Sequence, residues 1–137
     1  MEERRTDEKV VLTLTREQAQ MVEDACELYA RLRIGQFERI VEMMLDVRDA
    51  ENYCERRDTA AVLLQTVACV IFGRTAYGTP KCKKDALHHR AWNIYAALRH
   101  CLAWHDNPKG GWSVCYDEPY PWGGEAVPEC KVITEKV

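Results

Sequence analysis

Apolar residues recur at steps of three and four between residues 85 and 108, the longest run of helical period in the chain. This spacing places them on one face of a helix, which we expect to be buried. The positions are Leu87, Ala91, Ile94, Leu98, Cys101, Leu102 and His105. Arg99 falls at the edge of this face, and His88, Trp92, Tyr95 and Asp106 lie along the same edge.

A cation flanked by aromatic rings suits a planar or phosphate-bearing ligand, so Arg99, Trp92 and Asp106 are candidate ligand-binding residues. The same spacing also fits an arginine that pairs with an acid at a surface or an interface. Both interpretations of Arg99 stand on the sequence pattern.

The N-terminal part of the chain predicts one strand and two helices. Residues 9–14, KVVLTL, are rich in β-branched side chains and predict a short strand. Residues 16–33 predict a helix that begins at a capping box of Thr15 and Gln18 and exposes a Glu27–Arg31 pair to water. Gly35 breaks this helix, and residues 36–48 predict a second one. The expected buried stripe of the first helix is Met21, Val22, Ala25, Leu28, Tyr29 and Leu32.

Residues 59–72, TAAVLLQTVACVIF, are apolar on nearly every side. A helix without a polar face must be covered all round, and in a short chain this favours cover by another subunit. The residues before it, 49–58, are charged and include Arg56 and Arg57. These two arginines fit either a solvated helix start or a second anion-contacting pair at a subunit seam.

Residues 73–84, GRTAYGTPKCKK, contain breakers of regular structure and carry Tyr77 among basic residues. This segment could be a lid over a ligand or a solvated connector. Beyond the long helix, residues 112–116 and 130–134 predict short strands. Together these elements predict a single α+β domain over residues 1–137, mostly helical, with an N-terminal strand and a short C-terminal β element.

Composition narrows the function. The net charge of −3, with acids and bases interspersed, gives no basic footprint for DNA and no polybasic membrane patch. The acids of the predicted second helix argue against a helix-turn-helix DNA reader. The charged start MEERRTDEK does not resemble a signal peptide, which favours a cytoplasmic protein.

The cysteines, the serine and the glycines of the chain do not form a known metal-binding, catalytic or phosphate-binding motif. Seven cysteines without paired spacing predict reduced thiols with neither disulfides nor a metal. The chain lacks the nucleophile-elbow motif and both phosphate-cradling glycine motifs, so we expect a binding protein that is not an enzyme and needs no cofactor.

Three blocks together carry a resemblance to a known group of proteins. They are ELYARLRIGQFERIVEMM (27–44), AWNIYAALRHCLAWHDNP (91–108) and VCYDEPYPWG (114–123). The chain resembles a group of small phage-encoded proteins, and within it the first type of Thoeris anti-defence protein. Such proteins are described as holding, without cleaving, the cyclic ADP-ribose isomers that bacterial TIR-domain enzymes make. Some also take up cyclic oligonucleotides of the CBASS defence, and they assemble as dimers that can build hexamers.

The resemblance implies roles for individual residues. Phe72 would stack on adenine, Arg99 would contact the pyrophosphate, and Arg57 would belong to the oligonucleotide site. Tyr77, Trp92 and Asp106 are added from the helix-edge and loop arguments above. The expected protein is therefore a homo-oligomeric sponge for nucleotide signals in the cytoplasm of an infected bacterium. The alternative is a phage interaction module that blocks a host protein directly.

Overall fold

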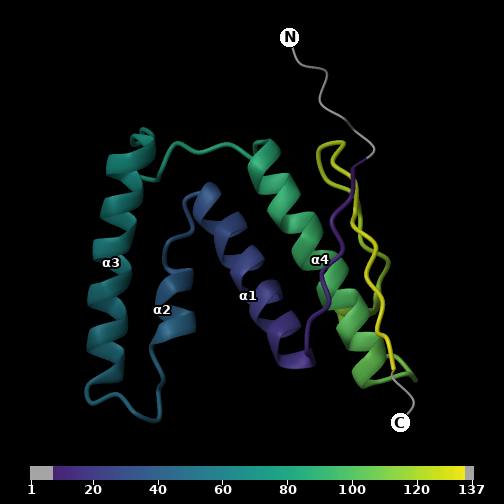
Figure 1. Ribbon diagram of the computed structural model, residues 1–137. Helices are drawn as coiled ribbons and strands as arrows, with labels where there is room; N and C mark the ends of the chain where they lie inside the picture. The colour runs from purple at the N-terminus through teal and green to yellow at the C-terminus, as the bar shows by residue number, and fades with distance from the viewer. Residues whose placement is uncertain (1–7, 135–137) are drawn as a thin grey trace.

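The computed structural model describes residues 8–134 and is built from helices joined by extended segments (Figure 1). Helices α1 and α4 lie side by side at the centre, and α3 stands apart at the edge with α2 between it and α1 (Figure 1). The elements in chain order are α1 (Arg16–Arg33), α2 (Arg39–Met44), α3 (Tyr53–Phe72), α4 (Ala86–Asp106) and the 3-10 turn η1 (Val114–Tyr116).

The predicted α+β class is wrong, because the described residues contain no sheet. Residues 9–14 are extended but form no strand, and Val10 and Val11 are 96% and 91% exposed. A strand needs a neighbour that pairs with its backbone, and β propensity alone does not supply one. At the other end, residues 114–116 close a 3-10 turn in which the Tyr116 N–H donates to the Ser113 carbonyl, while residues 130–134 remain irregular.

Helix α1 has the predicted limits, and its capping box is confirmed. The Gln18 N–H donates to the Thr15 hydroxyl at 3.1 Å, and the Thr15 N–H donates to the Gln18 side chain at 3.0 Å. Its predicted buried stripe is wrong in part, since Met21 is 68% exposed. The buried positions of α1 are Glu27 and Ala30, because these face α4 and α2.

Helices α1 and α4 form an antiparallel pair, and a salt bridge joins the two helices at each end. Arg33 pairs with Asp85 at one end, and Arg16 pairs with Asp106 at 2.7 Å at the other. Asp85 also caps α4, since its carboxylate accepts the His88 N–H at 2.9 Å. The long helix predicted over 85–108 is therefore confirmed within two residues at its end.

The buried apolar core is small and rich in alanine. Its members are Ala30, Val41, Ala68, Cys69, Ala91, Tyr95, Ala96, Ala97 and Leu102. Leu87 and His105, expected inside, are exposed. Small side chains let the helices approach closely, but they remove little apolar surface from water.

Helix α3 is longer than predicted and α2 is shorter. The α3 helix begins at Tyr53, whereas the predicted second helix over 36–48 is regular only over Arg39–Met44. One side of α3 is packed through Ala68 and Cys69, and its other sides are open. The exposed apolar side chains of α3 are Val62, Leu63, Val67, Val70 and Ile71.

The chain exposes much surface for its size. Its accessible surface is 10990 Å² at a mass of 15.8 kDa. A compact monomer of that mass has roughly 7300 Å². Among the described residues, none of the helices has the length and apolar composition that a membrane span requires.

Candidate functional site

The clearest concentration of ligand-binding chemistry lies along the edge of α4 that faces α1. His88, Trp92, Tyr95 and Arg99 occupy successive turns of one helix face, as the periodicity predicted. The His88 and Trp92 rings stack with centroids 6.1 Å apart, and Trp92 meets Tyr95 edge to face at 5.0 Å. We call these four residues the α4 ladder.

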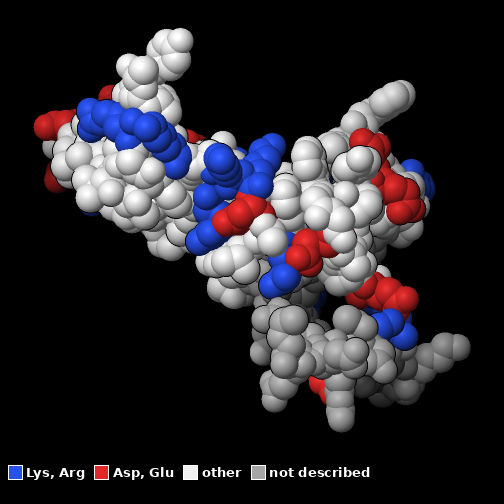
Figure 2. Space-filling model, turned by 90° about the horizontal axis from the view of Figure 1, so that it is seen from above, with Lys and Arg blue, Asp and Glu red and all other residues white. Residues whose placement is uncertain are grey.

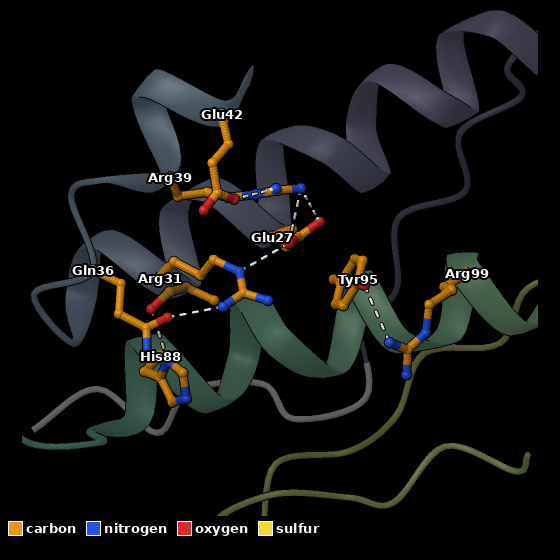
Figure 3. A network of polar contacts seen from close by, with 9 residues as sticks. Glu27, Arg31, Gln36, Arg39, Glu42, His88, Tyr95 and Arg99 are labelled. Atoms are coloured by element: carbon orange, nitrogen blue, oxygen red, sulfur yellow. Dashed lines mark hydrogen bonds and ion pairs between the residues drawn. The ribbon is translucent and has the colours of Figure 1, made fainter. Parts of the chain in front are cut away.

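Arg99 ends the ladder and forms no ion pair within residues 8–134. Its guanidinium lies over the Tyr95 ring at 4.9 Å, and Nη1 donates to the Tyr95 hydroxyl at 3.1 Å (Figure 3). Its Nε is buried and has no hydrogen-bond acceptor within residues 8–134. A guanidinium that is held against an aromatic ring and has no acid partner can bind an anionic oxygen through its outer nitrogens without first breaking an internal ion pair.

One carboxylate lies near Arg99. Glu23 of α1 has a raised pKa, mainly because burial penalises its charge and because Asp24 repels it, whereas Arg16 and Arg99 act in the opposite direction. An incoming anion at Arg99 would therefore be placed near an acid that accepts a proton more readily than an ordinary glutamate.

A second arginine approaches the ladder from α1. The Arg31 guanidinium lies 5.7 Å from the Trp92 ring centroid, while its Nε donates to Glu27 at 2.8 Å and its Nη1 donates to Gln36 at 2.8 Å. Figure 3 shows Glu27 between Arg31 and Arg39. Glu27 is only 7% exposed and also lies 3.2 Å from Arg39.

The predicted surface position of Glu27 is wrong, although its pairing with Arg31 is confirmed. Residue spacing along α1 alone could not reveal this burial. The antiparallel register could have revealed it, because it sets the Glu23–Glu27–Arg31 series of α1 opposite the α4 ladder. Near Trp92, the positive charge of Arg31 is therefore balanced by Glu27. At the other end of the ladder, the positive charge of Arg99 has no ion-pair partner within the described residues.

The structure brings only part of the predicted site together. Trp92 and Arg99 share the ladder through Tyr95. Asp106 instead holds α1 to α4 through Arg16, and this hydrogen bond lowers the pKa of its carboxyl. Asp106 is therefore occupied in an ion pair within the described chain.

The remaining predicted residues lie elsewhere. Phe72 ends α3 and packs edge to face on Phe37 at 6.1 Å, and α3 makes no contact with α4. Tyr77 is 94% exposed in the connection between these helices. Arg57 pairs with Asp58 at 3.0 Å and lies over the Tyr53 ring.

Arg56, which precedes Arg57, lines a surface hollow that we did not predict from the sequence. This open hollow of about 420 Å³ lies along the first half of α3. It is lined by Asn52, Glu55, Arg56, Thr59, Ala60 and Leu63. No group of three metal-ligating side chains occurs within residues 8–134.

Comparison of the chain with protein-family models, with curated proteins and with solved structures finds no match.

Proposed function

We propose that this chain binds a nucleotide signal of the cyclic ADP-ribose type and holds it without cleaving it. Sequestration of such a signal in the cytoplasm of an infected bacterium would inhibit anti-phage defence. The observation that carries the proposal is Arg99, whose guanidinium is stacked on Tyr95 and forms no ion pair within the described chain. The resemblance of the three sequence blocks supplies the class of ligand.

The chemistry of the α4 ladder suits the two parts of such a ligand. A pyrophosphate offers charged acceptors to the free edge of Arg99. A purine offers a flat face to the half-buried Trp92 ring once the Arg31 guanidinium, which lies over that ring, moves aside, and base–aromatic stacking contributes roughly 1–3 kcal/mol. A sponge requires ground-state affinity and slow release, so it has no need of groups that stabilise a transition state.

The role of Phe72 depends on assembly. Because α3 and α4 do not contact each other, Phe72 of the same protomer cannot meet a ligand on Arg99 at close range. The adenine-stacking role that the resemblance implies would then require Phe72 to come from another subunit. The cyclic-oligonucleotide role of Arg57 is proposed on the resemblance alone, since Asp58 occupies its guanidinium.

Homo-oligomer formation, as a dimer or a hexamer, is part of the proposal. The accessible surface of 10990 Å² exceeds that of a compact monomer by roughly 3700 Å². Obligate homo-oligomer interfaces bury about 2000–5000 Å² in total, which is about 1000–2500 Å² per partner, so the excess is larger than one such interface would cover. The open apolar side of α3, which includes Leu63 at 62% exposure, supports a second copy of the chain as its cover.

The decisive experiment is calorimetry with a cyclic ADP-ribose isomer on matched arginine variants. Arg99→Ala should weaken binding by about 2–5 kcal/mol, because phosphate oxygens would lose a charged donor in a partly dry site. Arg90→Ala is the control, since Arg90 lies on the same helix but pairs with Glu125 in an exposed position. Unchanged affinity in a folded Arg99→Ala protein would place the ligand elsewhere.

A second candidate is the interaction module that blocks a host protein, and the exposed apolar stripe of α3 favours it. The two candidates differ in what the purified protein releases. After incubation with the nucleotide and removal of free ligand, heat denaturation of a sponge should release intact nucleotide, detected by mass. A protein that releases none and binds none in calorimetry supports the interaction module.

A further inference from the structure

The connection between α3 and α4 contains an ordered hairpin over residues 73–81. Arg74 and Pro80 form an antiparallel bridge, and the Lys81 N–H donates to the Gly73 carbonyl at 2.9 Å. Across the turn, the Thr75 N–H donates to the Thr79 carbonyl at 2.8 Å, and the two threonine hydroxyls lie 2.7 Å apart. The hairpin therefore has a defined conformation before any ligand binds.

This hairpin lies against α3 and borders an open hollow of about 190 Å³ with it. The Cys69 thiol donates to the Gly78 carbonyl at 3.6 Å and fastens the hairpin to the helix. The hollow is lined by Val62, Gln65, Thr66, Cys69, Arg74 and Gly78. It lies on a different side of α3 from the exposed Leu63 and Val67, which project about a quarter turn or more away.

Arg74 gives the hollow its charge. Within residues 8–134, its side chain has no hydrogen-bond acceptor and no acid at ion-pair distance, in contrast to Arg33, Arg39 and Arg90. The segment 73–84 contains one arginine and three lysines and no acid. Figure 2 looks onto this end of the molecule and shows basic side chains gathered over it. A net negative chain thus carries a local positive field here.

The hollow also offers a neutral donor in the exposed side chain of Gln65. The Gln65 amide has no hydrogen-bond partner within the described chain, so its two N–H groups are available. The Thr66 hydroxyl already donates to the Val62 carbonyl at 2.9 Å and can only accept. Donors therefore outnumber free acceptors among the polar side chains that line the hollow.

We propose that this hollow binds the phosphate group of a small sugar phosphate, with Arg74 as the charged donor and Gln65 as the orienting one. Its volume of about 190 Å³ lies below the ~300–1000 Å³ of pockets that enclose drug-sized ligands. It therefore suits a phosphate with its adjoining sugar better than a whole dinucleotide. The proposal is independent of the α4 ladder and of the nucleotide-sponge function.

The probe is ribose 5-phosphate, with ribose as the matched ligand that lacks the phosphate. Amide shifts of residues 73–81 followed by nuclear magnetic resonance during titration should give a Kd on the order of 0.1–1 mM for ribose 5-phosphate. Ribose should cause no comparable shifts. Equal shifts with both ligands, or no saturable shift with ribose 5-phosphate, would overturn the proposal.

Variants assign the site. Arg74→Gln should weaken ribose 5-phosphate binding at least tenfold, and Gln65→Ala should weaken it several-fold. Arg48→Gln is the control, since Arg48 is 84% exposed and pairs with Asp46 away from the hollow. Circular dichroism establishes that each variant is folded. Undiminished binding in Arg74→Gln would show that the phosphate binds elsewhere, whatever the outcome for Arg99→Ala with cyclic ADP-ribose.

Discussion

The Nε–H of Arg31 donates to the buried carboxylate of Glu27 over 2.8 Å, and the same carboxylate lies 3.2 Å from Arg39. One acid of α1 thus pairs with an arginine on its own helix and with another on α2. Because Arg31 also lies over Trp92, Glu27 holds the arginine that contacts the second residue of the α4 ladder. Glu27, Arg31 and Arg39 thus link the buried interior of the protein to the Trp92 ring of the candidate site.

Glu27→Ala should reduce the free energy of unfolding by about 2–4 kcal/mol, measured by urea denaturation. Removing one partner of a buried ion pair costs about 3–5 kcal/mol, and the figure is reduced here because both guanidinium groups are about a third exposed. Glu42→Ala is the control, since this exposed acid also pairs with Arg39 and should cost under ~1 kcal/mol. Equal costs for the two variants would contradict the assigned role of Glu27.

Asp85→Asn should make the stability less dependent on acid pH. The hydrogen bond from Arg33 lowers the pKa of Asp85 from its usual 3.8, so its contribution is present above that value and is lost as pH falls through the lower, folded value. Asparagine keeps the α4 cap, since its amide oxygen can still accept the His88 N–H.

The measurement is the melting temperature at pH 7 and at pH 3 for wild type and Asp85→Asn. We expect the decrease between the two pH values to be smaller in the variant. Asp117→Asn removes an exposed carboxylate that has no ion pair among the described residues, and it should leave the decrease unchanged. A similar decrease in wild type and Asp85→Asn would show that the Arg33 pair does not contribute.

Leu63→Lys should separate the subunits of the proposed oligomer. Light scattering of the wild type at low micromolar concentration should give at least twice the mass of 15.8 kDa. A lysine on the open face of α3 would place a charge in the contact and shift the mass toward one protomer. Val47→Lys is the control, since Val47 is 63% exposed in the connection before α3. A wild type that remains at the mass of one chain refutes the assembly.

Local signals along the chain predicted the limits of α1 and α4 well, but not those of α2 and α3. The capping box of Thr15 and Gln18 and the cap at Asp85 depend only on residues three apart, so the sequence determines α1 and the start of α4 directly. The same locality placed Trp92, Tyr95 and Arg99 on one helix edge. These are features that a helix of period 3.6 imposes on its own sequence.

The wrong predictions concern features that depend on packing between segments far apart in the sequence. The β-branched residues 9–14 could form a strand only beside another strand, and the described chain provides none. Glu27 was expected in water because the packing of α1 against α4 and α2 is not encoded in its spacing. Phe72 and Arg99 were placed on one ligand, yet the structure puts their helices out of contact.

Asn93 is the largest side chain within residues 8–134 that is fully buried, and it fastens the C-terminal segment to α4. Its amide donates to the Trp122 carbonyl at 3.2 Å and to the Glu125 carbonyl at 3.0 Å, and its oxygen accepts the Trp122 N–H at 3.0 Å. One side chain thus satisfies three backbone groups of a loop that has no regular structure.

Asn93→Ala should release this loop and reduce the free energy of unfolding by about 2–3 kcal/mol, since unsatisfied buried backbone groups cost about 1–3 kcal/mol each and the freed loop can partly recover by turning to water. Hydrogen exchange should become faster at the Trp122 amide.

Asn93→Asp keeps the acceptor but loses both donors and buries a charge. This variant should therefore be at least as destabilised at pH 7, and its stability should recover as the carboxyl is protonated. Asn107→Ala, which removes the exposed side-chain contacts to Gly110 and Tyr116, should leave exchange at Trp122 unchanged. If Trp122 exchange in Asn93→Ala matches the wild type, the loop is held by its aromatic contacts, such as the Lys84 ammonium 4.8 Å above the Trp122 ring, and not by Asn93.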